Sequence, residues 1–267
     1  MNISAFVRSS VLSFVLLSVT AVPAFAEQVV KIGLTGAIYE EIWAPVAEKM
    51  AEEGVTLEYV QFSNFSLPNQ ALAGGEVDLN AFQHHAFLRN EIKNNGYDIT
   101  SIGDTFIVAM NLYSRKISSV QELKAGDKVA VPNDATNEGR ALKLLEAAGV
   151  LKLKEGAGAS PDLSAIASTR VPLEFVEVDA NLIVSLLPDV ALAAVNGNYA
   201  LDSGLTADEA IFKEPKYDDD SYTCLIACRS ADAQNPVFRR IVEVYQSQAV
   251  IDVFNTTFAG FFVPAWK

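Results

Sequence analysis

The chain holds few residues that could do chemistry, and they fall in two short stretches. The two histidines, His84 and His85, stand side by side in NAFQHHAFL, and no other histidine exists. The two cysteines, Cys224 and Cys228, lie four residues apart in SYTCLIACR. Imidazole and thiol groups can bind a transition metal, act as base and nucleophile, or line a binding pocket. The residue types alone leave these three kinds of site open.

The spacing of these residues argues against a metal site. Neighbouring residues on a helix point about 100° apart, so His84 and His85 cannot easily bind the same ion. Transition-metal sites usually take three or four ligands at set spacings, and neither HxxxH nor CxxC occurs in the chain. We therefore expect no metal and no other cofactor.

A Cys/His enzyme is the second possibility, with Cys224 or Cys228 as the nucleophile. Both cysteines lie in an apolar segment predicted to be a strand, without the sharp turn or helix N-terminus that lowers a thiol pKa. The sequence also lacks a serine elbow, a P-loop and a dinucleotide-binding motif. We expect no catalytic residue, and a secreted Cys/His enzyme stays as the weakest alternative.

The same strand bears on the pairing of the two cysteines. Residues i and i+4 of a strand are about 13 Å apart, whereas a disulfide needs Cα atoms within about 7 Å. We expect Cys224 and Cys228 to be buried, unpaired thiols.

The elements that must position these residues alternate between strands and helices. A buried strand is predicted over residues 28–36, and a helix over 40–54, which Gly54 ends. A strand over 55–62, a helix that begins at Pro68 and a short strand lead into the helix that carries both histidines. Alternation of this kind predicts a mostly parallel sheet.

A second series begins after a strand predicted over residues 105–114. It contains a strand over 128–133, a helix over 134–150 and a further strand–helix–strand series over 173–200. One packing helix is expected within 235–258. Two such series joined by extended segments suggest two α/β lobes.

The first 26 residues have the features of a secretory signal peptide: Arg8, an apolar run over 11–22 and the small-residue pattern Ala24-Phe25-Ala26. The run is shorter than the roughly 20 residues that span a bilayer. We expect cleavage after Ala26 and export to the periplasm. Glu27 follows that site in place of a cysteine, so we expect no lipoprotein and no direct membrane anchor.

The charge of the chain narrows its partners. Acidic residues outnumber basic ones 33 to 20, which gives a formal net charge of −13. A strongly negative surface repels phosphate groups, so neither nucleic acid nor an anionic membrane surface is an expected partner.

Four blocks of the sequence carry a family resemblance. They are FSNFSLPNQALAGGEVDLNAFQHHAFL, VAVPNDATNEGRALKLLEAAGVLKLK, DVALAAVNGNYALDSGL and VYQSQAVIDVFNTTFAGFFVPAW. In this order they resemble the NlpA/MetQ-type family of methionine-binding proteins of ABC importers. The resemblance implies a type II periplasmic-binding-protein fold, with two α/β lobes joined by a two-strand hinge and the ligand in the cleft. Lobe I would comprise residues 27–108 and 224–267, and lobe II residues 109–223.

The resemblance also implies a set of site residues. His84 directly follows the Phe-Gln pair and would line the cleft among aromatic rings, while Arg140 would bind the ligand carboxylate in a bidentate pair. His85 has no such role and is expected to face solvent. The ligand-binding candidates are Phe65, Phe82, His84, Phe87, Asn137, Arg140, Asn196 and Cys224.

Each candidate also has an ordinary structural interpretation. Arg140 could be a solvated charge on an amphipathic helix, and Asn196 could be a turn residue at a strand end. The phenylalanines could all belong to the core.

Some positions depart from the pattern of the family. Cys224 stands where relatives typically carry asparagine, Phe65 and Phe87 stand where tyrosine is common, and TGAIY lacks the usual Gly-Pro-His. The pocket is therefore expected to be more apolar. The implied function is that of a monomeric periplasmic protein that binds an amino acid, with methionine the first candidate, and delivers it to an ABC permease and its ATPase. The alternative is a different apolar amino acid or small ligand.

Overall fold

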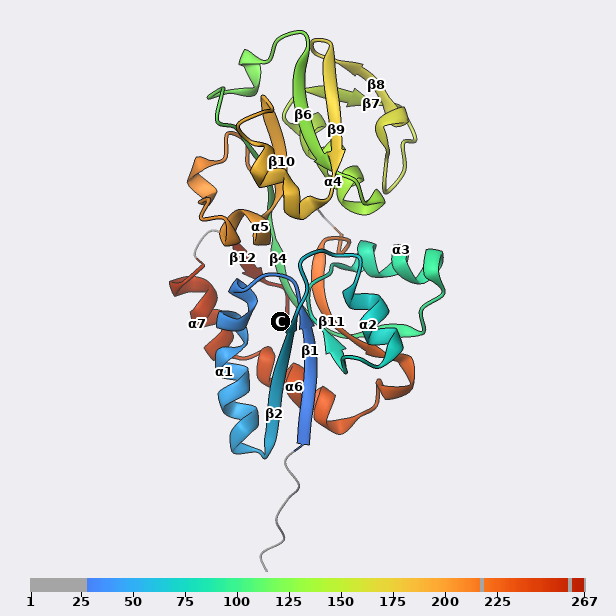
Figure 1. Cartoon of the computed structure of the whole chain (residues 1–267), viewed down its shortest axis with the longest axis vertical. Coiled ribbons are helices and arrows are strands. Elements are labelled where there is room, and N and C mark those ends of the chain that lie inside the picture. Colours follow the sequence, from blue (N-terminus) through green and yellow to red (C-terminus); the bar gives the residue numbers. More distant parts are fainter. Residues whose placement is uncertain (1–27, 217–218, 259–260, 267) are drawn as a thin grey trace, which may run out of the picture.

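The computed structural model describes residues 28–216, 219–258 and 261–266, which form two lobes stacked along the long axis of the molecule (Figure 1). The expected signal peptide lies outside these residues. Each lobe has its own β-sheet with helices packed on it. The predicted two-lobe α/β architecture is confirmed, whereas the assignment of residue ranges to the lobes stays a prediction.

Lobe I is built on a six-stranded sheet of order β12-β4-β11-β3-β1-β2. Its helices are α1 (Ile38–Glu52), α2 (Pro68–Gly74), α3 (His85–Asn95), α6 (Pro236–Tyr245) and α7 (Gln248–Thr256). Its strands are β1 (Gln28–Leu34), β2 (Val55–Gln61), β3 (Leu79–Asn80), β4 (Ile99–Val108), β11 (Thr223–Arg229) and β12 (Phe262–Pro264). A one-turn 3₁₀ helix, Ser230–Asp232, follows β11.

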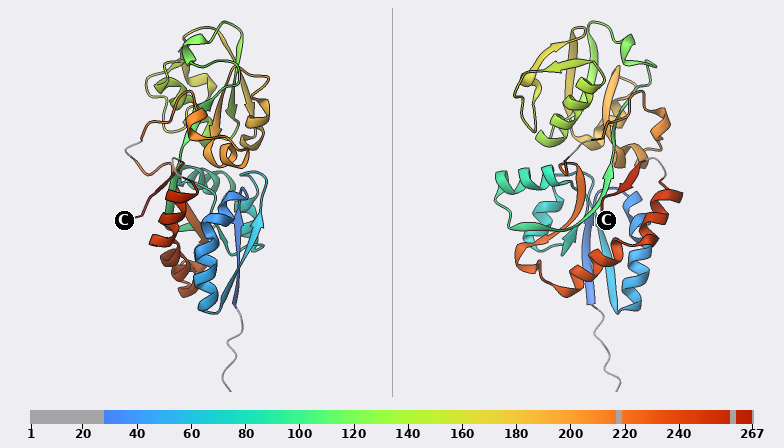
Figure 2. Two further views of the ribbon diagram at one scale, coloured as in Figure 1. Left: turned by 90° about the vertical axis from the view of Figure 1, so that its left-hand side faces the viewer. Right: turned by 180° about the vertical axis from the view of Figure 1, so that it is seen from behind.

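The strands of this sheet do not all run the same way. β1 pairs in parallel with β2 and β3, but β11 is antiparallel to both β3 and β4, and β12 is antiparallel to β4. The prediction of a mostly parallel sheet is therefore wrong for lobe I. The physical reason is that β4 leads out of the lobe and β11 brings the chain back beside it, in the opposite direction (Figure 2).

Lobe II contains a four-stranded sheet of order β5-β10-β6-β9 and a separate β7-β8 pair. Its strands are β5 (Met110–Tyr113), β6 (Asp127–Pro132), β7 (Leu151–Leu153), β8 (Ile166–Thr169), β9 (Leu173–Val178) and β10 (Leu192–Asn196). Its helices are α4, Ala135–Ala147, and α5, Gly197–Asp202, with 3₁₀ helices at Val120–Glu122, Leu163–Ala165, Ala180–Leu186 and Ala207–Glu209.

Two predicted elements are divided in the structure. The strand expected over residues 105–114 breaks at Ala109, because β4 belongs to the sheet of lobe I and β5 to that of lobe II. The single helix expected near the C-terminus is two helices, because Ser247 has an extended backbone, with φ −111° and ψ 166°, between α6 and α7.

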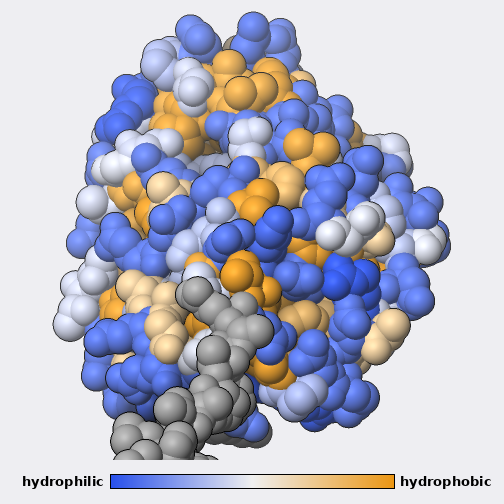
Figure 3. All heavy atoms as spheres, turned by 60° about the horizontal axis from the view of Figure 1, so that its bottom comes forward, coloured by the Kyte–Doolittle hydropathy of each residue, from blue (hydrophilic) through white to orange (hydrophobic). Residues whose placement is uncertain are grey.

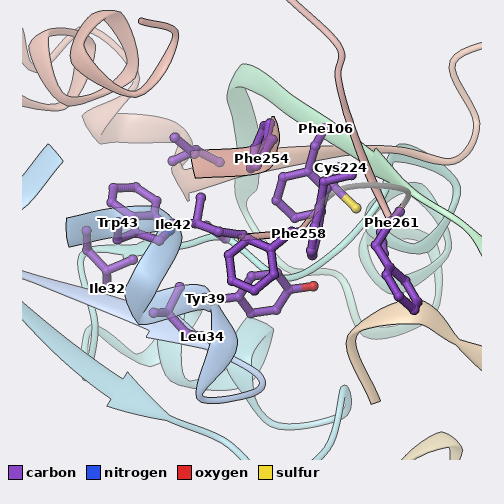
Figure 4. Close-up of a cluster of buried hydrophobic side chains, with 14 of the residues drawn as sticks. Ile32, Leu34, Tyr39, Ile42, Trp43, Phe106, Cys224, Phe254, Phe258 and Phe261 are labelled. Carbon is purple, nitrogen blue, oxygen red and sulfur yellow. The ribbon is translucent and has the colours of Figure 1, made fainter. Parts of the chain in front are cut away.

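The main hydrophobic core lies in lobe I and continues across the junction of the lobes. Trp43 and Tyr245 pack with their ring centroids 4.8 Å apart, and Tyr39 stacks on Phe106 at 5.7 Å. Figure 4 shows this cluster, with the sulfur of Cys224 at its edge. The same cluster contains buried residues of lobe II, among them Tyr113 and Val195. The two lobes are thus packed against each other, as in a closed form.

The surface is mostly polar. On the face drawn in Figure 3, hydrophobic residues lie scattered among hydrophilic ones. Over the described ranges, no helix combines the length and the apolar character that a bilayer crossing requires.

Candidate functional site

A pocket lies where the two lobes meet. Its wall is formed by residues of both lobes, which come from the ends of strands and the starts of helices, where α/β folds place ligands. All eight residues predicted from the sequence line this one pocket. The full lining is Tyr39, Phe65, Phe82, Gln83, His84, Phe87, Val108, Asn137, Arg140, Asn196, Asn198 and Cys224.

Four lining residues were not predicted. Tyr39 follows β1 and Asn198 follows β10, so a search of the residues after each buried strand would have found them. Gln83 stands next to His84 and was overlooked because it was treated only as part of the Phe-Gln-His pattern. Val108 is an ordinary apolar strand residue and offers no signal in the sequence.

One side of the pocket is aromatic. Phe65, Phe82 and Phe87 meet with ring centroids 5.8–6.1 Å apart, and Tyr199 of lobe II packs on Phe65 at 5.0 Å. Phe82 and Phe87 are buried, and Phe65 is partly buried. These rings form an apolar surface that suits an aliphatic or thioether side chain.

His84 is held as a neutral group at the start of α3. It is the N-cap residue and not part of the helix as predicted, with Nδ1 accepting a hydrogen bond from the Phe87 amide at 3.1 Å. The proton therefore lies on Nε2, which donates to Asn137 Oδ1 at 3.3 Å. Burial, together with the charge of Arg140, lowers the His84 pKa to about 3.

His85 does not face solvent as expected. Its Nε2 lies 2.7 Å from Asp104 Oδ1 on β4, and its side chain is only 19 % exposed. The first turn of α3 turns this side chain toward the sheet, away from the pocket. His84 and His85 therefore contact different parts of the structure, and they do not form one site.

A chain of hydrogen bonds fixes the orientation of two asparagine amides. Asp134, the N-cap of α4, accepts hydrogen bonds from the backbone N–H of Asn137 at 3.0 Å and from its Nδ2 at 2.9 Å. This turns Asn137 Oδ1 the other way, where it accepts a bond from Asn196 Nδ2 at 3.0 Å. Asn196 Oδ1 is then a buried acceptor that has no hydrogen-bond partner among the described residues. Such an atom is costly unless a ligand satisfies it.

Arg140 is buried, so its interpretation as a solvated charge is wrong. Its Nε and Nη2 donate to the two carboxylate oxygens of Glu214 at 2.7 and 2.6 Å, and Nη2 also donates to the Val108 carbonyl at 2.8 Å. The Tyr222 ring covers the guanidinium, with Cζ 4.4 Å from its centroid. Glu214 is not among the residues predicted from the sequence, because no local pattern connects it with an arginine 74 residues away.

The thiols are unsuited to nucleophilic chemistry. Cys224 and Cys228 are both free and buried, which confirms the prediction of unpaired thiols. Burial raises the pKa of Cys224 to about 12 and that of Cys228 to about 11, so neither is a thiolate at neutral pH. Both ring nitrogens of His84 are already engaged, and the geometry gives no support to a Cys/His enzyme.

The structure likewise contains no candidate metal centre within the described ranges. No group of three or more His, Cys, Asp or Glu side chains in this part of the chain could hold an ion. Among the described residues that line the pocket, Arg140 is the one charged side chain, and the others offer aromatic, aliphatic, amide, imidazole and thiol groups. Such a lining can bind a small molecule that carries both a carboxylate and an apolar part.

Comparison with known proteins places this pocket in a family. A model of the NlpA lipoprotein family matches residues 30–266. The chain belongs to the NlpA lipoprotein family. The resemblance inferred from the four sequence blocks is thereby confirmed over nearly all of the described residues.

Relatives and solved structures of the NlpA lipoprotein family agree with this assignment. The D-methionine-binding lipoprotein MetQ of Salmonella typhimurium is 41% identical over 244 residues, which cover 89% of this chain and 88% of that protein. A nutrient binding protein from Burkholderia cenocepacia bound to methionine has 37% identity and a TM-score of 0.84, and the match covers 89% of this chain and 100% of that one. The substrate binding protein of a methionine transporter from Streptococcus pneumoniae has 34% identity and a TM-score of 0.85, over 89% and 96% of the chains.

These relatives also bear on the expected location. Several are named as lipoproteins, as is the family itself, which fits a place in the cell envelope. The same names give no support to the expectation that this chain is not a lipoprotein.

Proposed function

We propose that this protein binds an apolar amino acid, with methionine the first candidate, and delivers it to an ABC permease and its ATPase. The observation that carries the proposal is the buried Asn196 Oδ1, which has no hydrogen-bond partner among the described residues and lies in the same pocket as Arg140 and three phenylalanine rings. An amino acid supplies a group for each: a carboxylate, an ammonium and an apolar side chain. The similarity to named methionine-binding proteins supports the choice of methionine.

The polar groups of the ligand would bind on the lobe II side of the pocket. Arg140 would pair with the carboxylate, since hydrogen bonds between charged groups are the strong ones. The ammonium would donate to Asn196 Oδ1, whose orientation the Asp134–Asn137 chain fixes. His84 and Cys224 stay neutral and add no charge that would compete.

The side chain of the ligand would lie against Phe65, Phe82 and Phe87. Burial of a methionine-sized group stabilises a complex by about 1.5–3 kcal/mol, and a sulfur–aromatic contact adds about 0.3–1.5 kcal/mol. A micromolar dissociation constant corresponds to about 8 kcal/mol. The charged groups must therefore supply the larger share of the binding free energy.

Binding and release would require the lobes to separate. His84 of lobe I donates to Asn137 of lobe II across the pocket, and Tyr199 Oη donates to the Ser63 carbonyl at 3.4 Å. The chain passes between the lobes at the β4–β5 junction and again just before β11, and these two segments are the natural hinges.

A thermal unfolding screen tests the proposal and its alternative together. The mature chain, stripped of carried-over ligand by unfolding and refolding, would be heated with each standard amino acid in turn. We expect methionine to raise the midpoint most, because a ligand that binds only the native state stabilises it by mass action. A larger shift with leucine or another apolar amino acid would reassign the ligand. No shift with any amino acid would contradict the proposal.

We further propose that the protein acts in the periplasm without a lipid anchor. The proposal is supported by Glu27, which stands in place of a cysteine after the expected cleavage site, and by the burial of Cys224 and Cys228 in β11. Intact-mass spectrometry of the protein from cell membranes and from the periplasmic extract would check this. A diacylglyceryl mass on the membrane fraction would contradict it.

A further inference from the structure

Glu214 is a buried carboxylate that stands behind the pocket and does not line it. Its side chain is 4 % exposed and that of Arg140 is 2 % exposed, so the ion pair between them is almost fully removed from water. The geometry is bidentate, with both carboxylate oxygens accepting from the guanidinium. Arg140, the one charged side chain among the described residues that line the pocket, is therefore already compensated before a ligand arrives.

Glu214 is held firmly in this position. Its Oε2 also accepts a hydrogen bond from the Met110 amide at 2.9 Å, and its own amide donates to Asn111 Oδ1 at 2.9 Å. Met110 and Asn111 begin β5, directly after the first passage between the lobes, while Glu214 precedes the second. The carboxylate thus joins the arginine of the pocket to both passages.

The remaining groups of the wall add no charge to this pair. His84 is neutral above a pKa of about 3, and the Cys224 thiol is neutral below a pKa of about 12. Asp134 does not line the pocket, and its carboxylate accepts hydrogen bonds from Asn137 and Thr136. Among the described residues that line the pocket, Arg140 is thus the one charged side chain, and its charge is balanced by that of Glu214.

We propose that Glu214, acting through Arg140, makes the pocket selective for ligands of zero net charge, that is for zwitterions over anions of the same size. The inference rests on the proposed function, because it refines which carboxylate-bearing molecules the same site accepts. An uncompensated buried arginine would attract any carboxylate. An arginine paired with Glu214 orients the carboxylate but leaves the pocket without surplus positive charge, so the ligand must bring its own ammonium.

The physical basis is the reach of a charge in a buried site. Coulomb interactions between groups several ångströms apart are weakly screened when water is excluded. Glu214 therefore repels the carboxylate of every ligand and attracts an ammonium. In a ligand that carries both a carboxylate and an ammonium, the repulsion and the attraction by Glu214 offset each other.

The test compares L-methionine with its 2-hydroxy analogue, which replaces the ammonium with a hydroxyl and has a net charge of −1. Affinities are measured by calorimetry for the wild type and for Glu214→Gln. We expect the wild type to prefer methionine by at least about tenfold. In Glu214→Gln the preference should shift toward the 2-hydroxy acid by about tenfold or more, the factor that corresponds to about 1.4 kcal/mol.

Two further variants separate charge from shape. Glu214→Asp keeps the charge and loses the bidentate geometry, so affinity should fall for both compounds while their ratio stays near that of the wild type. Glu53→Gln is the matched control, because Glu53 forms a similar two-oxygen pair with Arg240 on the surface of lobe I. It should change neither affinity.

The possible results are distinct. A wild type that binds the 2-hydroxy acid as tightly as methionine overturns the inference, and this comparison holds even if Glu214→Gln does not fold. An unchanged ratio in a folded Glu214→Gln protein that still binds methionine overturns the inference alone. A wild type that binds neither compound rejects the proposed function, and the inference falls with it.

Discussion

At the scale of single residues, the pocket depends on groups whose roles are set by their neighbours. Asn196 presents an acceptor because Asn137 takes its amide hydrogen, and Asn137 does so because Asp134 takes the hydrogens of its own amide. Arg140 is fixed by Glu214 in the same manner. The residues behind the pocket therefore decide whether a hydrogen-bond donor or an acceptor faces each group of the ligand.

The resemblance located the residues of this pocket better than their partners. All eight candidates line it, and all of them except Cys224 lie within the sequence blocks that carry the resemblance. Glu214 could not be predicted, because a contact over 74 residues leaves no local pattern and a Glu in a polar loop is normally solvated. The orientation of Asn196 likewise depends on a residue from another strand end.

Removal of one partner of the buried ion pair should destabilise the protein strongly, whereas replacement of both partners by apolar residues should not. Arg140→Met leaves Glu214 buried and uncompensated, so we expect a loss of about 3–5 kcal/mol in the free energy of unfolding. The double variant Arg140→Met/Glu214→Met removes both charges and should recover most of that loss. Urea unfolding of the two variants measures the difference. Equal destabilisation of the single and the double variant would contradict the importance of charge compensation.

The neutral His84 makes the protein sensitive to acid. Its folded pKa of about 3 lies below the unfolded value of about 6.5, so the unfolded state binds the proton more readily. Stability from this residue is complete above about pH 6.5 and is lost as the pH falls toward 3. Between pH 7 and pH 4, the free energy of unfolding should fall less in His84→Gln than in the wild type. We expect the difference between the two decreases to be up to about 3 kcal/mol. Identical decreases in the two proteins would show that His84 is not held neutral.

At the scale of elements, the pocket depends on how α5 meets the first passage between the lobes. Gly197 begins α5 directly after Asn196, and a Cβ built there would lie 2.5 Å from Val108 Cγ2 and 2.6 Å from the Ala109 carbonyl. This close approach was not foreseen, because β10 and β4 are distant in sequence. The order of the six-stranded sheet was unpredictable for the same reason, since β12 pairs with β4 and β11 lies between β3 and β4.

Gly197→Ala should therefore disturb the site, although Gly197 itself does not line the pocket. The backbone at Ala109 cannot move aside easily, so we expect about 1–3 kcal/mol of destabilisation and weaker ligand binding. Gly74→Ala is the control, because a Cβ at Gly74 of α2 meets no atom within 4 Å. Thermal unfolding and calorimetry of both variants make the comparison. If the two behave alike, α5 does not need this close contact.

At the scale of the whole molecule, polar and aromatic contacts join the two lobes in addition to the hydrophobic core that continues across their junction. Tyr199 of lobe II packs on Phe65 of lobe I and donates to the Ser63 carbonyl. The alternation of strands and helices predicted two α/β lobes correctly, because it is a local property of the sequence. The way in which the lobes meet was beyond prediction, since it depends on side chains from both.

Tyr199→Phe removes one hydrogen bond between the lobes and keeps the ring contact. A typical hydrogen bond contributes about 0.5–1.5 kcal/mol, so ligand affinity should fall by about two- to tenfold, mainly through faster release. Tyr245→Phe is the matched control, because the buried Tyr245 hydroxyl has no hydrogen-bond partner among the described residues and lies in the core of lobe I. Stopped-flow measurement of ligand release distinguishes them. An unchanged release rate in Tyr199→Phe would mean that this contact does not hold the lobes closed.

Isothermal titration calorimetry measures directly whether the pocket between the lobes binds methionine. The mature chain would be unfolded, freed of any carried-over ligand, refolded and titrated with L-methionine and then with D-methionine. We predict one-to-one binding of at least one isomer with a Kd of about 1 μM or tighter, and no binding to folded Arg140→Met. No heat from the folded wild type with either isomer would contradict the account.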